Sequence, residues 1–566
     1  MKRNLNSFTK KNYDIIIVGG GIFGVCATWE AASRGLHVAL LEKGDFSQAT
    51  SANHLKMIHG GIRYLQHGDI YRIRESCLER SALLRVAPHL CYPIPIVIPT
   101  YGHGVRSKEF LRAGLFLYDI FTIDRNSGIQ DPDRQILNGS FFSREKVLEL
   151  FPEIENNGLT GGVVFYDGQI YNPSRLAISF LRSAVDEGAD VSNYIEVTKF
   201  LIKGDQIFGV EVVDTLTGER FDILGKMVLN ASGPWAHRLL ETASGCKIEP
   251  TPLFSRDLGF VISRRFPHEY GLACQMKTKD ADAILSRGGR HVFAVPWRNY
   301  NLIGCWHVVY DKSPDEISVT EDELQKFIDD INQSYKNFSL TINDILMVNT
   351  GLTLFSDNNL RSNNISFGKR SLLIDHEKAH NLKGLVTLIG VRATIARGMA
   401  EKAIDLIFKK LKRKSPISKT AVTPIFGGEI ECFSKFLHSA IEEKSFHLSA
   451  DVINGLIYNY GSKYKNVLKY VDENMKWAHP IGDSTVIKAE VIHSIREEMA
   501  MKLVDVVFRR TDFGTSGNFK EESIYIIAQL MESELEWNKN RAENEINEVA
   551  NIIKNKNVLK SYKTGY

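Results

Sequence analysis

Three glycines and one acid near the start of the chain have the spacing of a dinucleotide-binding site. Gly19, Gly21 and Gly24 fit the pattern G-x-G-x-x-G, and Glu42 follows them in the chain. Such glycines allow a tight turn, a close approach of the backbone to a pyrophosphate, and close packing of a helix on a strand. The N–H groups at the start of that helix attract phosphate, and the acid accepts hydrogen bonds from a ribose. The pattern therefore predicts a bound dinucleotide.

Two apolar segments and one helix must position these residues. Residues 13–18 and 37–41 are rich in β-branched and aliphatic side chains, which is typical of buried parallel strands. Residues 22–33 lie between them and predict a helix that ends before Gly35. The glycines then lie at the turn after the first strand and the acid at the end of the second, as a Rossmann-type site requires.

The segment after the acid favours one dinucleotide over another. It is polar, with hydroxyls at Thr50 and Ser51 and a cation at Lys56. Gly60 and Gly61 allow the backbone to approach a flat ring closely. These features favour a flavin that stays bound, FAD, over NAD. A polar surface loop is the alternative, because loops carry most polar residues.

The composition is that of a large globular protein. The chain has 566 residues, of which 43% are hydrophobic and 24% charged, and its net charge is +3. These values exclude extensive disorder and a basic nucleic-acid-binding surface, and a chain of this size needs no disulfide or metal to fold. Its seven cysteines form no C-x-x-C pair, and no apolar segment is long enough to span a membrane. We expect a cytoplasmic protein, with peripheral contact to the inner face of the cytoplasmic membrane left open.

Further motifs give the chain a close resemblance to one family. They are DIIIVGGGIFG at 14–24, LLEKGDFSQATSANHLKMIHGGIRYLQHGD at 40–69, NASGPW at 230–235, VPW at 295–297, NYGSKY at 459–464 and RRTDFG at 509–514. In these motifs the chain resembles the FAD-dependent (aerobic) glycerol-3-phosphate dehydrogenase family over nearly its whole length. The resemblance implies that the secondary alcohol of glycerol 3-phosphate, or of a similar polyol phosphate, is oxidised by hydride transfer to flavin N5. It also implies that the electrons pass to quinone or oxygen.

The resemblance further implies which residues hold the cofactor. Gly19, Gly21, Gly24 and Glu42 would bind the ADP half of FAD, and Thr50, Ser51 and Lys56 would lie along the molecule. His59, Gly60 and Gly61 would lie beside the isoalloxazine, and Ala231, Gly233 and Trp235 near the adenine. Gly390, Val391 and Thr394 would contact the ribityl chain and the pyrophosphate.

On the substrate side the resemblance places Arg63 and Tyr64 at the substrate. A guanidinium forms paired hydrogen bonds to phosphate, which suits Arg63, although an ordinary surface ion pair is the alternative. A base must accept the hydroxyl proton, and imidazole suits this role at neutral pH. His307 and His59 are the candidate catalytic bases. A hydrogen-bonded structural histidine is the alternative for each.

The substrate side departs from the family at several positions. The family has an arginine where this chain has Thr353, and a lysine where it has Arg392. A T-T-D segment is replaced by Cys305, Trp306 and His307. We expect the bulky Trp306 to change the shape of the pocket, and Arg392 to bind substrate. Compensation for the missing arginine is expected from Arg256, Lys369 or Arg370.

The segment pattern and the resemblance together predict an α/β fold. A FAD-binding Rossmann-like domain is interrupted by a mixed-sheet substrate domain and followed by a C-terminal α-helical domain. The expected pieces are 1–90, 160–250 and 356–412 for the FAD domain, 91–159 and 251–355 for the substrate domain, 413–424 for a linker, 425–545 for the helical domain and 546–566 for a polar tail.

Three other functions remain open at this point. The same flavin chemistry could act on a different hydroxy substrate, such as a larger sugar or polyol conjugate, because the substrate side has changed. A flavin-binding protein without dehydrogenase turnover is a second alternative, since fold alone does not fix function. An NAD-dependent dehydrogenase is the third, and it requires a colourless protein.

Overall fold

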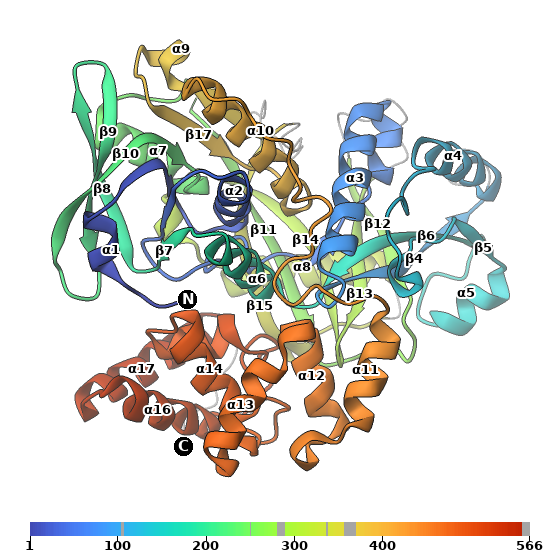
Figure 1. The fold of residues 1–566 in the computed structure, drawn as a ribbon. Helices are drawn as coiled ribbons and strands as arrows, with labels where there is room; N and C mark the ends of the chain where they lie inside the picture. The colour runs from blue at the N-terminus through green and yellow to red at the C-terminus, as the bar shows by residue number, and fades with distance from the viewer. Residues whose placement is uncertain (103–106, 250, 280–288, 336–337, 356–369, 557–566) are drawn as a thin grey trace.

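The computed structural model describes residues 1–102, 107–249, 251–279, 289–335, 338–355 and 370–556. These residues form two mixed sheets with helices packed against them, and a helical domain at the C-terminal end (Figure 1). The predicted α/β fold is confirmed, and so are the first strand and helix, which are β1 (Asn12–Val18) and α2 (Ile22–Ser33).

The first sheet is built around β1, which is buried along all but its first residue. β1 pairs in parallel with β2 (Val38–Leu41) on one side and with β10 (Arg220–Asn230) on the other. The strand order is β16-β17-β10-β1-β2-β7, and β9 pairs with β8 and with the first half of β10. The remaining bounds are β7 (Asp190–Ser192), β8 (Ile195–Lys203), β9 (Gln206–Asp214), β16 (Leu372–Asp375) and β17 (Leu385–Ile389).

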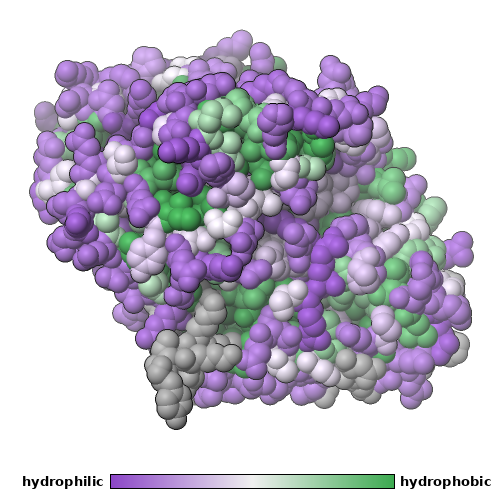
Figure 2. Space-filling view, turned by 90° about the horizontal axis from the view of Figure 1, so that it is seen from below, coloured by the Kyte–Doolittle hydropathy of each residue, from purple (hydrophilic) through white to green (hydrophobic). Residues whose placement is uncertain are grey.

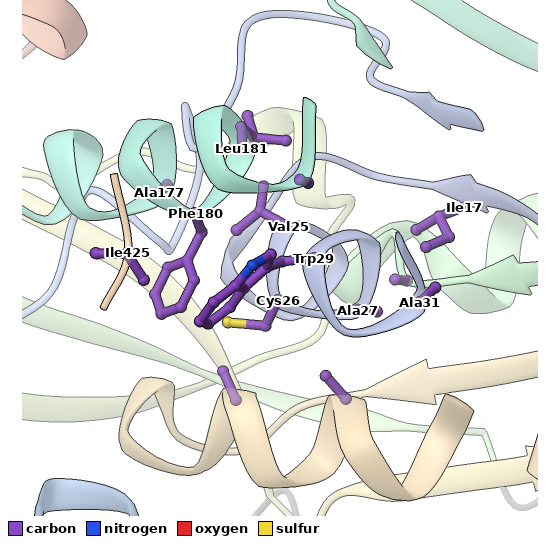
Figure 3. Close-up of a cluster of buried hydrophobic side chains, with 14 of the residues drawn as sticks. Ile17, Val25, Cys26, Ala27, Trp29, Ala31, Ala177, Phe180, Leu181 and Ile425 are labelled. Carbon is purple, nitrogen blue, oxygen red and sulfur yellow. The ribbon is translucent and has the colours of Figure 1, made fainter. Parts of the chain in front are cut away.

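Three helices cover one face of this sheet. α2 packs against both α6 (Pro173–Asp186) and α10 (Ala396–Lys410). Trp29 of α2 and Phe180 of α6 meet with their ring centroids 5.4 Å apart, at the centre of a buried apolar cluster (Figure 3). α7 (Ala236–Ser244) packs against β8 on the opposite side. The apolar sequence of β1 is thus explained by burial on both faces.

The second sheet has the strand order β15-β11-β14-β13-β12-β4-β6-β3, and β5 pairs with β6. The helix α8 (Glu321–Ser334) begins with a capping box formed by Thr320 and Glu323 and buries four apolar side chains against this sheet. The strand bounds are β3 (Met57–Ile58), β4 (Cys91–Tyr101), β5 (Ser140–Phe142), β6 (Leu159–Ile170), β11 (Leu253–Ile262), β12 (Gly271–Lys279), β13 (Gly289–Trp297), β14 (Tyr300–Tyr310) and β15 (Ile345–Phe355).

The strand pairing shifts two of the predicted domain boundaries. β6 pairs with β4 over its whole length, so residues 159–170 lie with the substrate sheet and not with the FAD domain. β3 also belongs to the second sheet, and the chain therefore crosses from one sheet to the other between β2 and β3. A run of apolar residues predicts that a strand is buried, but not which sheet it joins.

The first four helices of the C-terminal part form their own apolar core, whereas the later ones pack their apolar side chains into the core of the second sheet. Their bounds are α11 (Phe433–Glu442), α12 (Ala450–Tyr460), α13 (Lys465–Glu473), α14 (Lys488–Glu498), α15 (Leu503–Asp505), η10 (Val506–Arg510), α16 (Glu522–Leu535) and α17 (Lys539–Lys556). Residues 546–556 of the predicted polar tail instead continue α17, with Val549 and Ile553 buried, and residues 557–566 lie outside the described part. The face that carries these helices is mostly hydrophilic (Figure 2). No described helix has both the length and the apolar composition needed to cross a bilayer.

A buried ion cluster joins the C-terminal helices to the first sheet. The two carboxylate oxygens of Asp45 accept hydrogen bonds from Arg509 Nε at 2.5 Å and from Arg510 Nη1 and Nη2 at 2.7 and 2.6 Å. The side chains of Asp45 and Arg510 are fully buried. Burial alone would raise the pKa of Asp45, but the charges of Arg510 and Arg509 lower it to about 2.

Removal of one partner from this cluster should destabilise the protein strongly. Arg510→Met leaves the Asp45 charge buried with less compensation, and breaking such a pair costs about 3–5 kcal/mol. Because a carboxyl with a lowered pKa stabilises the fold only while ionised, this contribution should persist at neutral pH. It should disappear as the pH falls from the usual value of 3.8 to about 2. Thermal unfolding at neutral pH measures the effect. Lys520→Met, which removes an exposed ion pair with Asp483, is the control and should leave the melting temperature unchanged.

Candidate active site

A cavity of about 1000 Å³ lies between the two sheets and is lined by residues from both. The first sheet contributes the turn after β1, the end of β2 and the end of β10. The second sheet contributes residues of β3, β6, β11, β13, β14 and β15. The segment that links β2 to β3, the 3-10 helix η1 (Ile62–His67), β8, α7 and the turn after β17 also line it. The cavity is therefore assembled from parts of the chain that are far apart in sequence.

The glycines of the first turn are needed for the reasons that the sequence indicates. Gly19 has φ +108°, and a Cβ there would lie 2.7 Å from the carbonyl oxygen of Ala231. A Cβ on Gly24 would lie 1.8 Å from the carbonyl oxygen of Gly19. Gly24 therefore does not line the cavity but lets α2 pack on the turn. Gly21 precedes α2 and lines the cavity, so the helix N-terminus faces a potential phosphate.

The acid at the end of the second strand is already fixed in place. Glu42 lines the cavity, and its carboxylate accepts hydrogen bonds from the N–H of Gly20 at 2.6 Å and of Gly44 at 2.9 Å. Burial raises the pKa of Glu42, while these two N–H groups act in the opposite direction. The backbone thus holds the carboxylate beside the glycine turn, where a ribose would follow a pyrophosphate.

The segment between β2 and β3 lines the cavity with hydroxyls and with Lys43, but not with Lys56. Ser51 Oγ accepts a hydrogen bond from the N–H of Ile22 at 2.9 Å, and Thr50 also lines the cavity. Lys56, expected along the cofactor, instead lies on the other side of the segment. Its Nζ is 4.6 Å from the centroid of the Trp297 ring, and it lines a separate cavity of about 530 Å³. Lys56 has φ +61°, which turns its side chain away from the expected direction.

The two glycines after His59 have different roles. Gly61 lines the cavity, as expected beside a flat ring. Gly60 does not line it, because its N–H donates to Asp167 Oδ1 at 2.6 Å and a Cβ there would lie 2.0 Å from Arg80 Nη1. Gly60 is thus needed for packing on a buried arginine. The other expected cofactor residues line the cavity: Ala231, Gly233, Trp235, Gly390, Val391 and Thr394.

Arginine side chains line the part of the cavity next to α3 (Ile70–Val86). Arg63, Tyr64 and Arg392 all line it. Arg392 Nη1 donates to the hydroxyl of Tyr64 at 2.6 Å and to Ser76 Oγ of α3 at 2.9 Å. Arg72, which the sequence did not single out, also lines the cavity and lies over the Tyr64 ring at 4.4 Å. Its guanidinium also pairs with Asp69, the cap of α3, at 2.7 Å.

Arg256 is not a substrate residue in this structure. Successive residues of a strand face opposite sides, and in β11 it is Asp257 that lines the cavity. Arg256 points to the outer face, where it pairs with Glu323 of α8 and donates to the carbonyl of Ser318. Of the other expected compensating cations, Arg370 is exposed and outside the cavity lining, and Lys369 lies outside the described residues.

The same alternation removes Trp306 from the pocket. The Trp306 ring stacks on Phe327 of α8, with centroids 5.7 Å apart and planes 11° apart. Its neighbours Cys305 and His307 line the cavity instead. The expectation that Trp306 reshapes the pocket is therefore wrong. The departure that does reach the cavity is Thr353, whose hydroxyl donates to Asp257 Oδ2 at 2.7 Å.

Two imidazole–carboxylate pairs face the cavity. His307 Nδ1 lies 2.6 Å from Asp257 Oδ1, and His59 Nδ1 lies 3.2 Å from Asp167 Oδ2. Burial would raise the pKa of Asp257, but the charge and hydrogen bond of His307 and the hydroxyls of Thr353 and Ser255 hold it below the usual value. Asp257 is thus an anion inside the cavity wall. Neither acid was singled out in the sequence, since each meets its histidine only through strand pairing.

Comparison with known proteins decides the family. Residues 14–389 match the family model of FAD dependent oxidoreductases, and residues 418–542 match the C-terminal domain of alpha-glycerophosphate oxidase. The chain belongs to the FAD-dependent oxidoreductases.

Similar proteins cover nearly the whole of this flavoenzyme. The glycerol-3-phosphate dehydrogenase of Synechocystis sp. is 30% identical over 96% of this chain and 97% of the relative. The aerobic glycerol-3-phosphate dehydrogenase of Staphylococcus haemolyticus is 28% identical over 90% of this chain and 88% of the relative. A solved glycerol-3-phosphate dehydrogenase from Bacillus halodurans, complexed with FAD, has the same fold, with TM-score 0.77, 22% identity and coverage of 98% of this chain and 97% of that chain.

The residues of the flavoenzyme fit its cofactor. The glycine turn and Glu42 offer the N–H groups and the carboxylate that an ADP moiety needs. A Cβ on Gly390, at the second turn, would lie 1.9 Å from the Phe23 ring of α2, so the two cofactor-facing turns pack directly on each other. Both turns line one continuous cavity. FAD is therefore the cofactor that this cavity holds.

Loss of the close contact at Gly24 should release the flavin. Gly24→Ala forces α2 away from the Gly19 turn, because the added Cβ would overlap the Gly19 carbonyl oxygen. We expect purified Gly24→Ala to carry much less flavin per chain, as measured by the ratio of visible to ultraviolet absorbance. Gly455→Ala is the matched control, since it adds the same methyl to a helix where the nearest atom is 3.6 Å away. Equal flavin content in both variants would contradict the role assigned to Gly24.

Proposed function

We propose that this flavoenzyme oxidises the secondary alcohol of glycerol 3-phosphate, or of a closely similar polyol phosphate. The observation that carries the proposal is the group of guanidinium side chains, Arg63, Arg72 and Arg392, that lines the cavity beside α3. Guanidinium groups bind phosphate through paired, charge-assisted hydrogen bonds. The names of the curated relatives support the same substrate.

Different residues of the chain would bind the substrate and accept its proton. Arg63 and Arg392 would hold the phosphate, and Tyr64 would fix Arg392 through the hydrogen bond that the guanidinium donates to it. His307 or His59 would accept the proton of the substrate hydroxyl, since both imidazoles line the cavity. FAD, when bound, supplies the two-electron acceptor.

A larger sugar conjugate is less well supported as substrate. The argument for it was an altered pocket shape, and Trp306 does not reach the pocket. Thr353 does line the pocket, but its hydroxyl is committed to Asp257. The three guanidinium groups on the α3 side supply the positive charge that an arginine at position 353 would have supplied. A small anionic polyol therefore fits the described lining best.

The substrate is tested by reduction of the bound flavin without oxygen. Glycerol 3-phosphate should bleach the flavin, whereas glycerol and larger sugar conjugates should not. Arg392→Met should raise KM for glycerol 3-phosphate by about 10- to 150-fold, the value of one lost charge-assisted hydrogen-bonding group. Arg238→Met is the control: it also removes an arginine that lines the cavity, but one that belongs to α7 and is 63% exposed, not one on the α3 side. Its KM should not change.

Two results would count against this substrate. A flavin that glycerol 3-phosphate leaves oxidised, while another hydroxy compound reduces it, would assign a different substrate. An equal rise of KM in Arg392→Met and Arg238→Met would show that the α3 side of the cavity does not hold the phosphate.

We also propose that quinone or oxygen accepts the electrons and that the enzyme contacts a membrane surface through α3 and α4 (Lys108–Phe121). These helices pack against each other at one end of the molecule (Figure 1). Their exposed apolar side chains are Ile70, Tyr71 and Leu78 on α3, Phe116, Leu117 and Ile120 on α4, and Ile123 just beyond α4. An apolar surface of this kind marks an interaction site, and it borders η1, which lines the cavity.

The basic N-terminus is less suited to this contact than the α3–α4 surface. Arg3 pairs with Asp214, and Lys11 pairs with Asp190. The helix α1 (Leu5–Thr9) buries Phe8 against the first sheet. These cations are held by the fold, whereas the α3–α4 surface has its apolar side chains exposed beside the cavity.

Binding to lipid vesicles tests the α3–α4 surface. Phe116→Glu should weaken binding to anionic phospholipid vesicles by about tenfold or more, because a phenylalanine that is 67% exposed would otherwise bury its ring in lipid. Ile417→Glu, at an isolated side chain that is 89% exposed, is the control and should bind as the wild type does. Co-sedimentation measures both. Equal binding by all three proteins would exclude this surface as the contact.

A further inference from the structure

The two imidazole–carboxylate pairs of the cavity differ in the charge that remains on the carboxylate. In the first pair, Asp167 accepts a hydrogen bond from Arg80 Nη1 at 2.8 Å and from the N–H of Gly60 at 2.6 Å. The side chains of Arg80 and Asp167 are 0% and 3% exposed. A full positive charge at this distance, shielded from water, offsets the charge of Asp167. His59 therefore has a partner whose negative charge is already neutralised.

Among the described residues, the second pair has no such counter-charge from a lysine or arginine. Asp257 receives hydrogen bonds from the hydroxyls of Thr353 and Ser255, each at 2.7 Å, besides its contact with His307. The hydroxyls orient the carboxylate without neutralising it. Its charge is thus available to stabilise an imidazolium at His307.

The solvent exposure of the two imidazoles points the same way, while Asp257 is the more exposed of the two carboxylates, 21% against 3% for Asp167. The His307 side chain is 14% exposed and the His59 side chain 42% exposed. A charge pair is stronger where water is excluded, so the carboxylate acts more strongly on His307. The shorter Nδ1–Oδ1 distance in this pair, 2.6 Å against 3.2 Å, adds to the difference.

We propose that His307 is the catalytic base and that Asp257, oriented by Thr353 and Ser255, is its positioning residue. This inference rests on the proposed function for the identity of the substrate. A neutral imidazole that donates through Nδ1 to Asp257 carries its lone pair on Nε2, and Nε2 takes the proton from the substrate hydroxyl. The resulting imidazolium is stabilised by Asp257. His59 then serves to orient the cofactor-facing loop.

Thr353 acquires a specific role in this arrangement. An arginine at that position, next to Asp257, would form an ion pair with the carboxylate and cancel the charge that His307 needs. A threonine supplies a hydrogen bond without a charge. The departure from the family at Thr353 therefore changes which group hydrogen-bonds to Asp257, the residue that positions the base.

Other titratable groups face His307 and must be considered. His291 from β13, Cys305 from its own strand and His54 from the β2–β3 segment line the same cavity. Burial raises the pKa of the Cys305 thiol and lowers the pKa of His54 to about 3, so both remain neutral around pH 7. His291 is the remaining imidazole on this side, and a His291→Gln variant should keep the pH profile of the wild type.

The test combines steady-state kinetics with a titration of the holoenzyme in the absence of substrate. His307→Gln should lower kcat by about 100-fold or more and abolish the acidic limb of the pH–rate profile. Asp257→Asn should lower kcat by about tenfold or more and move that limb to lower pH. Thr353→Val should lower kcat by about 2- to 10-fold at unchanged KM, and Thr353→Ser should restore it. His59→Gln should keep the limb.

The visible spectrum of the bound flavin provides a readout that needs no substrate. Protonation of an imidazole in the cavity changes the electric field at the flavin ring, so the wild type should show a pH-dependent change in the flavin spectrum. That change should move to lower pH in Asp257→Asn and vanish in His307→Gln. All variants are compared at equal flavin content.

The outcomes separate this inference from the proposed function. If glycerol 3-phosphate does not reduce the wild-type flavin, the proposed substrate is wrong, and the spectral titration alone decides the role of His307. If Asp257→Asn matches the wild type in both readouts, or if His59→Gln loses the acidic limb and His307→Gln keeps it, the inference is overturned. A rise of KM without loss of kcat in Thr353→Val would instead make Thr353 a substrate-binding residue.

Discussion

The active-site cavity depends on how one segment without helix or strand crosses between the two sheets. Residues 43–56 leave the first sheet at β2 and enter the second at β3, and many of the cofactor-lining side chains belong to this crossing. Since such a segment has no ladder of backbone hydrogen bonds, it needs specific partners. Asp45 attaches its start to Arg509 and Arg510 of the C-terminal domain. Further along, Thr50 Oγ1 accepts from the N–H of Leu352 on β15 at 2.9 Å.

These attachments explain why the C-terminal helices belong with the catalytic unit. They contribute none of the residues that line the main cavity in the described part of the chain. Their contribution is indirect, since Asn193 donates to both Asp45 and the carbonyl of Met499 and so ties the first sheet to the same cluster. A buried cluster of this kind fixes geometry more than it adds net stability, because desolvation opposes the attraction. The helical domain thus holds one wall of the cofactor cavity in place.

The cofactor half of the site could be predicted from the sequence because its signals are local. The glycine turn, the acid and the β1–α2–β2 unit lie within one short stretch, and each residue type has a backbone reason for its place. Lys56 was misplaced because its direction depends on a positive φ that composition does not reveal. Gly60 was predicted beside the ring, but the structure uses it for packing on Arg80, a residue twenty positions later in the chain.

In the substrate half, the identity of the lining side chains depends on which face of β11 and β14 each residue lies on. The sequence alone does not show this. A shift of one residue in β11 or β14 would exchange Asp257 with Arg256, or His307 with Trp306, between the cavity and the outer face. Contacts on the outer face fix the observed orientation of these strands. There Trp306 stacks on Phe327 and Arg256 pairs with Glu323, and Phe327 and Glu323 both belong to α8. A helix that does not touch the cavity therefore decides which side chains enter it.

The pairing register of β11 with β14 and β15 brings the polar side chains around the proposed base together. Asp257 lies opposite His307 of β14, and Ser255 lies opposite Thr353 of β15. Because residues two apart on a strand share a face, these four side chains from three neighbouring strands all point the same way. Groups held by paired strands are placed more rigidly than groups on loops, which suits a base that must meet a small substrate in one orientation. The side that we propose to bind the phosphate, by contrast, is carried by η1 and the turn after β17, where Arg392 is held by hydrogen bonds to Tyr64 and Ser76. In the proposed reaction, paired strands thus position the base, and side chains outside the strands bind the anionic group of the substrate.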